Sequence, residues 1–226
     1  MRLDLVVHRL PRFYQWKLDV ISYIKRALYR VLLMDRKIDL QRKAIQDRNN
    51  KLIAKYVAGK SVLEIGCGRG SLLGTLAKDL QCKCVGVDLS LEMINYARKN
   101  NPGPVYQVMD SSDLSFSDRQ FDVVLFNYVL HHVKDLDRTI AEAKRVGKTI
   151  IFYESCAWEG HPFKTISRLY WKITDGGYEY LTLNEWKRRF QLQVLDEIKG
   201  SSFIRYGMCV LRVDGVPILR TKKQRA

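Results

Sequence analysis

The 226-residue sequence has no apolar run of the roughly 18 residues that a bilayer-spanning helix needs. It also has no uninterrupted apolar stretch of the signal-peptide kind near its N-terminus, because charged residues break up each candidate. Cysteine is scarce: there are five, an odd number, and no Cys-x-x-Cys spacing. We therefore expect a cytoplasmic protein in a reducing compartment, without a zinc site, and we assign no metal ligands.

Acidic residues are few outside the middle of the chain. The net charge is +15, and residues 1–50 carry 12 Lys/Arg against 5 Asp, while residues 187–226 carry 10 Lys/Arg against 3 acids. Residues 51–186 are nearly neutral, with 17 Lys/Arg against 16 acids. Basic ends of this kind favour contact with phosphates of nucleic acid or anionic lipid, although a generally basic, solvated surface explains the same pattern.

From residue 61 onward, apolar strand-like runs alternate with helical patterns. This alternation predicts an α/β fold with a doubly wound, Rossmann-like, mainly parallel sheet. A closing antiparallel pair over 192–198 and 203–213 brings the expected sheet to seven strands with an antiparallel last strand. The expected strands are Ser61–Ile65, Lys83–Asp88, Val105–Met109, Phe121–Asn127 and Thr149–Glu154, and the expected helices are Ser71–Leu80, Leu91–Asn100 and Leu136–Val146, the last ending at Gly147 as a C′ glycine.

Two regions depart from the alternation. Residues 1–50 are expected to form a basic, amphipathic helical extension or lid before a main domain over 51–226. Residues 155–181 are dense in aromatics and predict an inserted lid, with Gly176 and Gly177 as a hinge. Thr182 and Glu185 then form a Ser/Thr-x-x-Glu capping box that starts a short helix.

A glycine-rich turn, "VLEIGCGRG" (Val62–Gly70), follows the first expected strand. A phosphate-binding P-loop is excluded because no Lys follows Gly70, and the dinucleotide pattern lacks its sixth-position glycine, which is Ser71 here. The carboxylate of Glu64 beside the turn disfavours an anionic pyrophosphate and suits a ligand that carries positive charge, such as an ammonium or sulfonium.

Polar residues end the next three strands. Asp88 follows Gly66 by 22 residues, a place where an acid commonly accepts hydrogen bonds from ribose hydroxyls. Asp110 and Ser111 end the third strand, where a carboxylate can accept from an adenine amino group, and Asn127 ends the fourth. Because parallel strands end at one edge of the sheet, these side chains are expected to share a ligand site there.

Together these stretches resemble the class I S-adenosylmethionine-dependent methyltransferases, in particular the methyltransferase type 11-like group that acts on small molecules. The resemblance covers "VLEIGCGRG", "GVDLSLEMINYARKN" and "FDVVLFNYVLHHV", within Val62–Glu154. It implies that the chain binds S-adenosylmethionine and acts as a methyltransferase. The implied contacts are Gly66, Cys67 and Gly68 with the methionine part, Glu64 near its ammonium, Asp88 with the ribose, Leu89, Asp110 and Ser111 with the adenine, and Asn127 beside the methionine part.

Methyl transfer to a hydroxyl or an acidic carbon benefits from a base, and relatives resemble the "LHHV" stretch that holds His131 and His132. We predict His131 as the catalytic base, with a structural histidine as the alternative. In the aromatic segment, Tyr178, Tyr180 and Trp158 are candidate substrate contacts. A mini-core packed on the sheet edge explains the same aromatic residues.

The favoured function is methyl transfer to O, N or C of a small or amphipathic, lipid-like acceptor. An RNA acceptor is the alternative, since a tRNA-modifying type also carries a His-His stretch, but the prolines of base-amino methyltransferases are missing after Asn127. A non-catalytic, methyltransferase-like subunit is a second alternative. Residues 12–33 carry basic and aromatic residues that suit peripheral contact with an anionic membrane surface.

Overall fold

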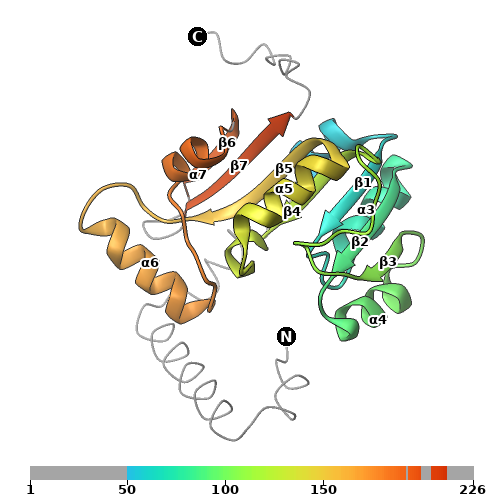
Figure 1. The fold of residues 1–226 in the computed structure, drawn as a ribbon, viewed down its shortest axis with the longest axis horizontal. Helices are drawn as coiled ribbons and strands as arrows, with labels where there is room; N and C mark the ends of the chain where they lie inside the picture. The colour runs from blue at the N-terminus through green and yellow to red at the C-terminus, as the bar shows by residue number, and fades with distance from the viewer. Residues whose placement is uncertain (1–49, 192, 200–204, 213–226) are drawn as a thin grey trace, which may run out of the picture.

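The computed structural model describes residues 50–191, 193–199 and 205–212, which form one sheet with helices on both faces (Figure 1). The predicted extension over residues 1–50 and the basic tail lie outside the described residues, except for Asn50. The sheet order is β3-β2-β1-β4-β5-β7-β6. The strands are β1 Ser61–Ile65, β2 Lys83–Asp88, β3 Val105–Val108, β4 Phe121–Asn127, β5 Gly147–Cys156, β6 Gln193–Lys199 and β7 Arg205–Arg212.

Strands β1 to β5 run parallel, and β7 is antiparallel to both of its neighbours, β5 and β6. The chain winds outward from β1 through β2 to β3, and then returns to the other side of β1 to form β4 and β5. The strand order therefore reverses between β1 and β4, and ligands of open parallel sheets bind outside the carboxyl ends of the strands at such a point.

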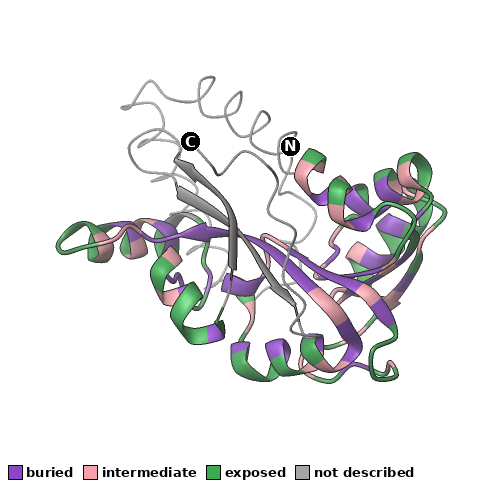
Figure 2. Cartoon of the chain, turned by 90° about the horizontal axis from the view of Figure 1, so that it is seen from above, coloured by how far each residue is buried: buried purple, intermediate pink, exposed green. Residues whose placement is uncertain are grey.

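Alternating side chains of the central strands pack into two separate cores. In β4, Val123 and Leu125 belong to the core on one face, while Val124 and Phe126 belong to the core on the other. The first core also holds residues of helix 50–57, α3 Ser71–Leu80 and α4 Leu91–Asn100, and the second those of α5 Leu136–Val146 and α7 Leu183–Phe190. Figure 2 shows the buried sheet between helices whose outer sides are exposed.

The doubly wound fold predicted from the sequence is confirmed, and most element boundaries agree. Strand β3 ends at Val108, one residue early, and β5 runs from Gly147 to Cys156, longer than predicted. The expectation that Gly147 is a left-handed C′ glycine is wrong: its φ is −118° and it begins β5 directly. Its lack of a side chain matters for packing, since a Cβ there would collide with Val124.

Between β5 and α7 lies the lid segment, residues 157–182, which contains α6 Phe163–Thr174. It starts two residues later than the predicted insertion because Ser155 and Cys156 still belong to β5. Thr182 caps α7 with the predicted capping box to Glu185. In the part of the chain that the structure describes, no helix is both long and apolar enough to span a membrane.

Candidate functional site

In the glycine turn after β1, Gly66, Gly68 and Gly70 have left-handed backbone conformations, and Gly66 and Gly68 differ in what surrounds them. Gly66 has a φ of 71°, and a Cβ there would collide with Val129. Gly68 has a φ of 51°, and a Cβ added there would meet nothing within 4 Å, so its backbone is open to a ligand. The turn therefore packs against the protein at Gly66 and presents bare backbone at Gly68.

A cavity of about 600 Å³ opens at the carboxyl ends of β1 to β4. Five of the residues predicted to contact the cofactor line it: Gly66, Asp88, Leu89, Asp110 and Ser111. The other four, Glu64, Cys67, Gly68 and Asn127, are not among its lining residues. The structure thus gathers most of the predicted cofactor contacts at one cavity.

Asp88 joins the end of β2 to the glycine turn. Its Oδ2 accepts a hydrogen bond from the backbone N–H of Gly68 at 2.9 Å, and its Oδ1 accepts one from Ser90 at 2.9 Å. Each carboxylate oxygen keeps a further lone pair for a ligand hydroxyl. The next residue, Leu89, is 74% exposed, which leaves an apolar surface for a planar ring to cover.

After the end of β3, the side chains of Asp110 and Ser111 differ in how available they are for a hydrogen bond to a ligand. Asp110 Oδ1 accepts from the backbone N–H and the hydroxyl of Ser112, and these hydrogen bonds lower the pKa of Asp110 below its usual value. The Ser111 hydroxyl lies 3.0 Å from that of Thr139 on α5. The ionised carboxylate of Asp110 is therefore a suitable acceptor for an amino group, whereas the Ser111 hydroxyl is engaged with α5.

Glu64 and Asn127 provide the test of whether this site fits a cationic ligand. Neither lines the cavity, although the adjacent residues Ile65 and Tyr128 do, and Glu64 is only 2% exposed. Burial, followed by repulsion from Asp88, raises the pKa of Glu64 to about 8, although a hydrogen bond from Asn127 opposes this. Among the described residues, no donor reaches Glu64 Oε2 or Asn127 Oδ1. Two buried acceptors without donors match a ligand ammonium, which has three N–H donors and a positive charge.

His131 occupies the short 3-10 helix after β4 and is 3% exposed. Its Nδ1 lies 2.6 Å from Glu154 Oε2 on β5, and its Nε2 lies 2.9 Å from Asp175 Oδ2 in the lid segment. Burial lowers the pKa of His131, but the hydrogen bonds to Asp175 and Glu154 outweigh it and raise the pKa to about 9. The ring is therefore an imidazolium at neutral pH, with both nitrogens occupied.

The predicted role of His131 as a base does not fit these surroundings, because a protonated ring between two carboxylates has no lone pair to offer. Glu154 is itself held in place, since its Oε1 accepts from the backbone N–H groups of Val129 at 2.8 Å and Leu130 at 2.7 Å. The chain Glu154–His131–Asp175 thus ties the lid segment to β5 and to the loop after β4.

The neighbouring His132 differs from His131 in its exposure, in its position at the cavity and in the direction in which its pKa is shifted. Its side chain is 45% exposed and lines the cavity at the strand ends. Its ring lies 4.2 Å from that of His131, and its Nε2 lies 3.9 Å from Asp175 Oδ2. Burial and the positive charge of His131 lower the pKa of His132. The ring is therefore neutral at neutral pH and faces the cavity.

His131, His132 and Asp175 each offer one atom that could coordinate a metal, and these atoms lie within 4.8 Å of one another. The distance of 2.9 Å between His131 Nε2 and Asp175 Oδ2 is that of a hydrogen bond. Two ligands of a tetrahedral zinc ion, each about 2.1 Å from the metal, lie roughly 3.4 Å apart. The cluster therefore has the geometry of a hydrogen-bonded network, and we derive no metal chemistry from it.

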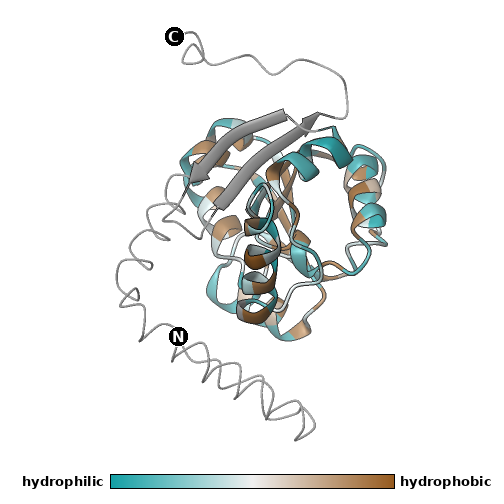
Figure 3. Cartoon of the chain, turned by 90° about the vertical axis from the view of Figure 1, so that its left-hand side faces the viewer, coloured by the Kyte–Doolittle hydropathy of each residue, from teal (hydrophilic) through white to brown (hydrophobic). Residues whose placement is uncertain are grey.

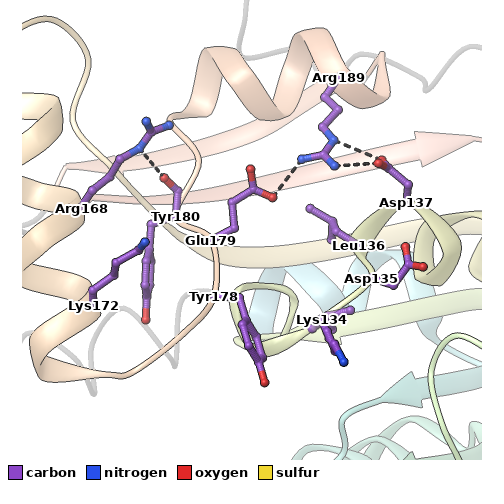
Figure 4. A pocket seen from close by; sticks show the side chains of 11 residues that line it. Lys134, Asp135, Leu136, Asp137, Arg168, Lys172, Tyr178, Glu179, Tyr180 and Arg189 are labelled. Carbon is purple, nitrogen blue, oxygen red and sulfur yellow. Dashed lines mark hydrogen bonds and ion pairs between the residues drawn. The ribbon is translucent and has the colours of Figure 1, made fainter.

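A second cavity, of about 850 Å³, adjoins the first and is shown in Figure 4. The two share Val133, Lys134, Asp135 and Tyr178 in their linings. Arg189 is neutralised there by Asp137 at 2.7 Å and Glu179 at 2.9 Å. Within the described residues, Lys134 has no ion-pair partner. The second cavity thus offers a cation and a tyrosine where it meets the first.

The three predicted substrate residues have different surroundings. Tyr178 is 64% exposed and lines both cavities. Tyr180 borders the second cavity but is 2% exposed, and its hydroxyl donates to Asp175 at 3.1 Å. Trp158 packs against Phe163 and lines neither cavity. Tyr178 alone of the three is both exposed and at the junction of the cavities.

The predicted glycine hinge also has a more specific role. A Cβ on Gly177 would lie 2.6 Å from the carbonyl oxygen of His131, so this glycine allows the lid segment to pack on the loop after β4. The backbone N–H of Tyr178 donates to the same carbonyl at 2.7 Å.

Sequence reasoning missed Asp175 and Glu154. The acid at the end of β5 and the "DGG" motif are the available signals, but neither reveals contact with His131.

Comparisons with known proteins agree with this geometry. Residues 63–149 match a family model described as "Methyltransferase domain". The chain is 34% identical over 111 residues to a fatty-acid O-methyltransferase of Mycolicibacterium smegmatis, a match that covers 48% of this chain and 40% of that protein. It is 28% identical over 120 residues to the ubiquinone/menaquinone biosynthesis C-methyltransferase UbiE of Desulfotalea psychrophila, covering 49% of each. The chain therefore spans about half or less of the length of these relatives.

Among solved structures, the YcgJ protein of Bacillus subtilis superposes with a TM-score of 0.63 at 18% identity, covering 73% of this chain and 97% of that one. At this identity the likeness concerns the fold. The sheet order, the glycine turn and the acids at the strand ends agree with the sequence match over the same region. Residues 63–149 thus match the methyltransferase domain model, and the fold around them is that of solved S-adenosylmethionine-dependent methyltransferases.

Proposed function

We propose that this protein transfers a methyl group from S-adenosylmethionine to a small or amphipathic acceptor. The observation that carries the proposal is the pair of buried acceptor atoms, Glu64 Oε2 and Asn127 Oδ1, which among the described residues have no donor. They lie at the strand edge that also carries Asp88, where an ammonium and a ribose would both find partners. A dinucleotide or a nucleoside triphosphate would bring negative charge to the same place.

Residues that line the first cavity and others next to them would each contact a different part of the cofactor. Asp88 would accept hydrogen bonds from the ribose hydroxyls, Leu89 would cover the adenine, and Asp110 would accept from the adenine amino group. Glu64 and Asn127 would hold the ammonium, and the open backbone at Gly68 allows close approach. Cys67 is buried, and Ser111 engages Thr139, so both support the walls of this site. When bound, S-adenosylmethionine supplies an electrophilic methyl group on a sulfonium.

His132 is our candidate for the base in place of His131. It is neutral at neutral pH, it lines the cavity, and the Asp175 carboxylate lies 3.9 Å from its Nε2. A proton taken from an acceptor O–H would leave an imidazolium beside Asp175, whose charge stabilises it. His131 is then a positioning residue, because it holds Asp175 beside His132. This division of labour favours acceptors that must lose a proton, such as hydroxyl or enol groups.

The second cavity is the proposed acceptor site. It shares Tyr178 and Lys134 with the first cavity, so an acceptor there would lie next to the proposed donor site. The activities that name the fatty-acid O-methyltransferase and UbiE concern lipid-like molecules, and they support an acceptor of that class here.

An RNA acceptor is the competing proposal, supported by the +15 charge of the chain. It predicts binding that weakens steeply between low and moderate salt, because phosphate contacts release counterions. A small acceptor in the second cavity should bind with little dependence on salt. Filter binding of RNA over a salt series separates the two.

Isothermal titration calorimetry of the full chain with S-adenosylmethionine tests the function itself. Binding at micromolar concentration is expected, and S-adenosylhomocysteine should compete for the same site. A radiolabelled donor offered with free fatty acids, quinols and RNA then identifies the acceptor class. If the chain takes up no donor at concentrations of about 1 mM, the methyltransferase proposal fails, and a non-catalytic subunit replaces it.

A further inference from the structure

Helix α6 in the lid segment leaves one row of large apolar side chains in solvent. Phe163, Ile166, Leu169 and Ile173 are 54%, 52%, 58% and 42% exposed. Their spacing of three, three and four residues places them along one side of the helix. In Figure 3, α6 faces the viewer and carries hydrophobic residues among hydrophilic ones. Isolated exposed apolar residues are ordinary, but an aligned row of four is a contact surface.

The opposite side of α6 is already used for packing. Trp171 is 5% exposed in the core beneath the helix, and Lys164 and Arg168 form ion pairs with Glu185 of α7 at 2.7 and 2.6 Å. These contacts fix the rotation of the helix about its axis. The apolar row is therefore held outward by the fold, and it is not a face that the described residues can cover by turning the helix.

The charged residues of α6 indicate which kind of surface the apolar row would contact. The helix contains three cations, Lys164, Arg168 and Lys172, and no acid. Since Lys164 and Arg168 pair with Glu185 on the opposite side, Lys172 is the cation of this helix that has no ion-pair partner among the described residues. An apolar row beside such a cation suits a helix that lies in the headgroup region of an anionic bilayer. The net charge of +15 adds a general attraction to such a surface. From Phe163 to Ile173 the row extends over about 15 Å of the helix.

We propose that the apolar row of α6 (Phe163, Ile166, Leu169 and Ile173) docks on the surface of an anionic lipid bilayer. The helix would lie in the plane of the interface with this row among the acyl chains near the headgroups. Arg168 and Lys172 of the same helix line the second cavity, so docking would place that cavity at the membrane surface. The inference concerns binding to lipid and does not depend on methyl transfer.

Vesicle flotation with the full chain tests it, using phosphatidylcholine vesicles with and without about one third phosphatidylglycerol. The double variant Ile166→Ser/Leu169→Ser removes the centre of the row, and both side chains are exposed, so the fold should persist. Val105→Ser is the matched control, because Val105 is 55% exposed on the edge strand β3. Thermal melting of all three proteins verifies that they are folded.

We expect the wild type and Val105→Ser to float with anionic vesicles, and the double variant to lose at least about tenfold in partition coefficient. Neutral vesicles should retain much less protein. Equal flotation of the double variant would overturn the proposal, as would the absence of wild-type binding. Sedimentation velocity supplies a further check: a wild-type dimer that the double variant converts to a monomer would mean that a second copy covers the row, and would also overturn it.

Discussion

The carboxyl edge of strands β1 to β4 lines the first cavity and the lid segment lines mainly the second, and the two regions are held in place by different contacts. At the strand edge, Asp88 ends β2 and Asp110 follows β3, and backbone N–H groups two residues later, of Ser90 and Ser112, position their carboxylates. In the lid segment, Asp175 is positioned by His131, which lies 44 residues earlier in the sequence. Contacts near each strand end position the polar groups of the first region, whereas a buried charge network positions those of the second.

The two adjacent histidines show what this difference means. His131 faces two carboxylates and carries a proton, while His132 faces the cavity and is neutral. A single loop thus supplies one residue that fastens the lid segment and one that can accept a proton. Substitutions in the two regions should therefore affect donor affinity, turnover and the free energy of unfolding to different extents.

The largest effect is expected from His132→Asn. Loss of the proposed base should lower turnover about 100- to 10,000-fold on any acceptor that the wild type methylates. Donor affinity should be nearly unchanged, because His132 lines the cavity without holding the buried cation site. Turnover is measured by transfer of radiolabel, and affinity by calorimetry. Unchanged turnover would remove His132 from the reaction and leave proximity as the main source of rate.

The next effect concerns the strand edge. Asp88→Ala removes both the ribose acceptor and the hydrogen bond that orders Gly68, so donor affinity should fall at least about 100-fold. Asp175→Ala is the control from the lid segment and should leave donor affinity within about threefold. Calorimetry of both variants makes the comparison. Equal losses would show that the lid segment and the strand edge are one cooperative unit.

The charge network should contribute to stability in a way that depends on pH. The pKa of His131 rises from 6.5 to about 9 on folding, which corresponds to at most about 3 kcal/mol of stability. Since the folded pKa is the higher one, this contribution is complete below about pH 6.5 and is lost as the pH rises toward about 9. Asp175, whose pKa is lowered chiefly by the hydrogen bond from His131 against the effect of burial, remains ionised throughout.

Urea unfolding of the wild type and of His131→Gln measures this contribution. The difference in unfolding free energy should be largest near pH 6 and should shrink as the pH approaches about 9. Glu64 also destabilises the protein as the pH rises, because its own folded pKa is raised, but both proteins contain it and the difference cancels it. A difference that is constant with pH would contradict the charged state assigned to His131.

Much of the strand edge could be predicted from the sequence because its determinants are local. The glycines of "EIGCGRG" require a left-handed turn, and Asp88, Asp110 and Asn127 are at strand ends that the apolar runs delimit. The lid contacts could not be predicted, since no periodicity links Asp175 to His131. The prediction of His131 as the base does not fit the structure for the same reason: two identical neighbours differ only in which one the fold buries between carboxylates.

The smallest expected effect concerns the proton on Glu64. With its pKa near 8 in the absence of a ligand, Glu64 is largely protonated at neutral pH. A ligand ammonium beside it favours the carboxylate, so binding of the donor should release up to one proton, and affinity should rise by up to about tenfold between pH 6 and 7. Calorimetry in buffers with different ionisation enthalpies counts the released protons.

The ammonium of the donor can itself exchange protons, and for that reason Glu64→Gln is the necessary control. The variant keeps the shape of the side chain but cannot ionise, so it should bind the donor more weakly and with less proton release than the wild type. Identical proton release in both proteins would place the titration on the donor alone. In that case the buried acceptor oxygen of Glu64 would have another partner, and the cation site at the strand edge would have to be reassigned.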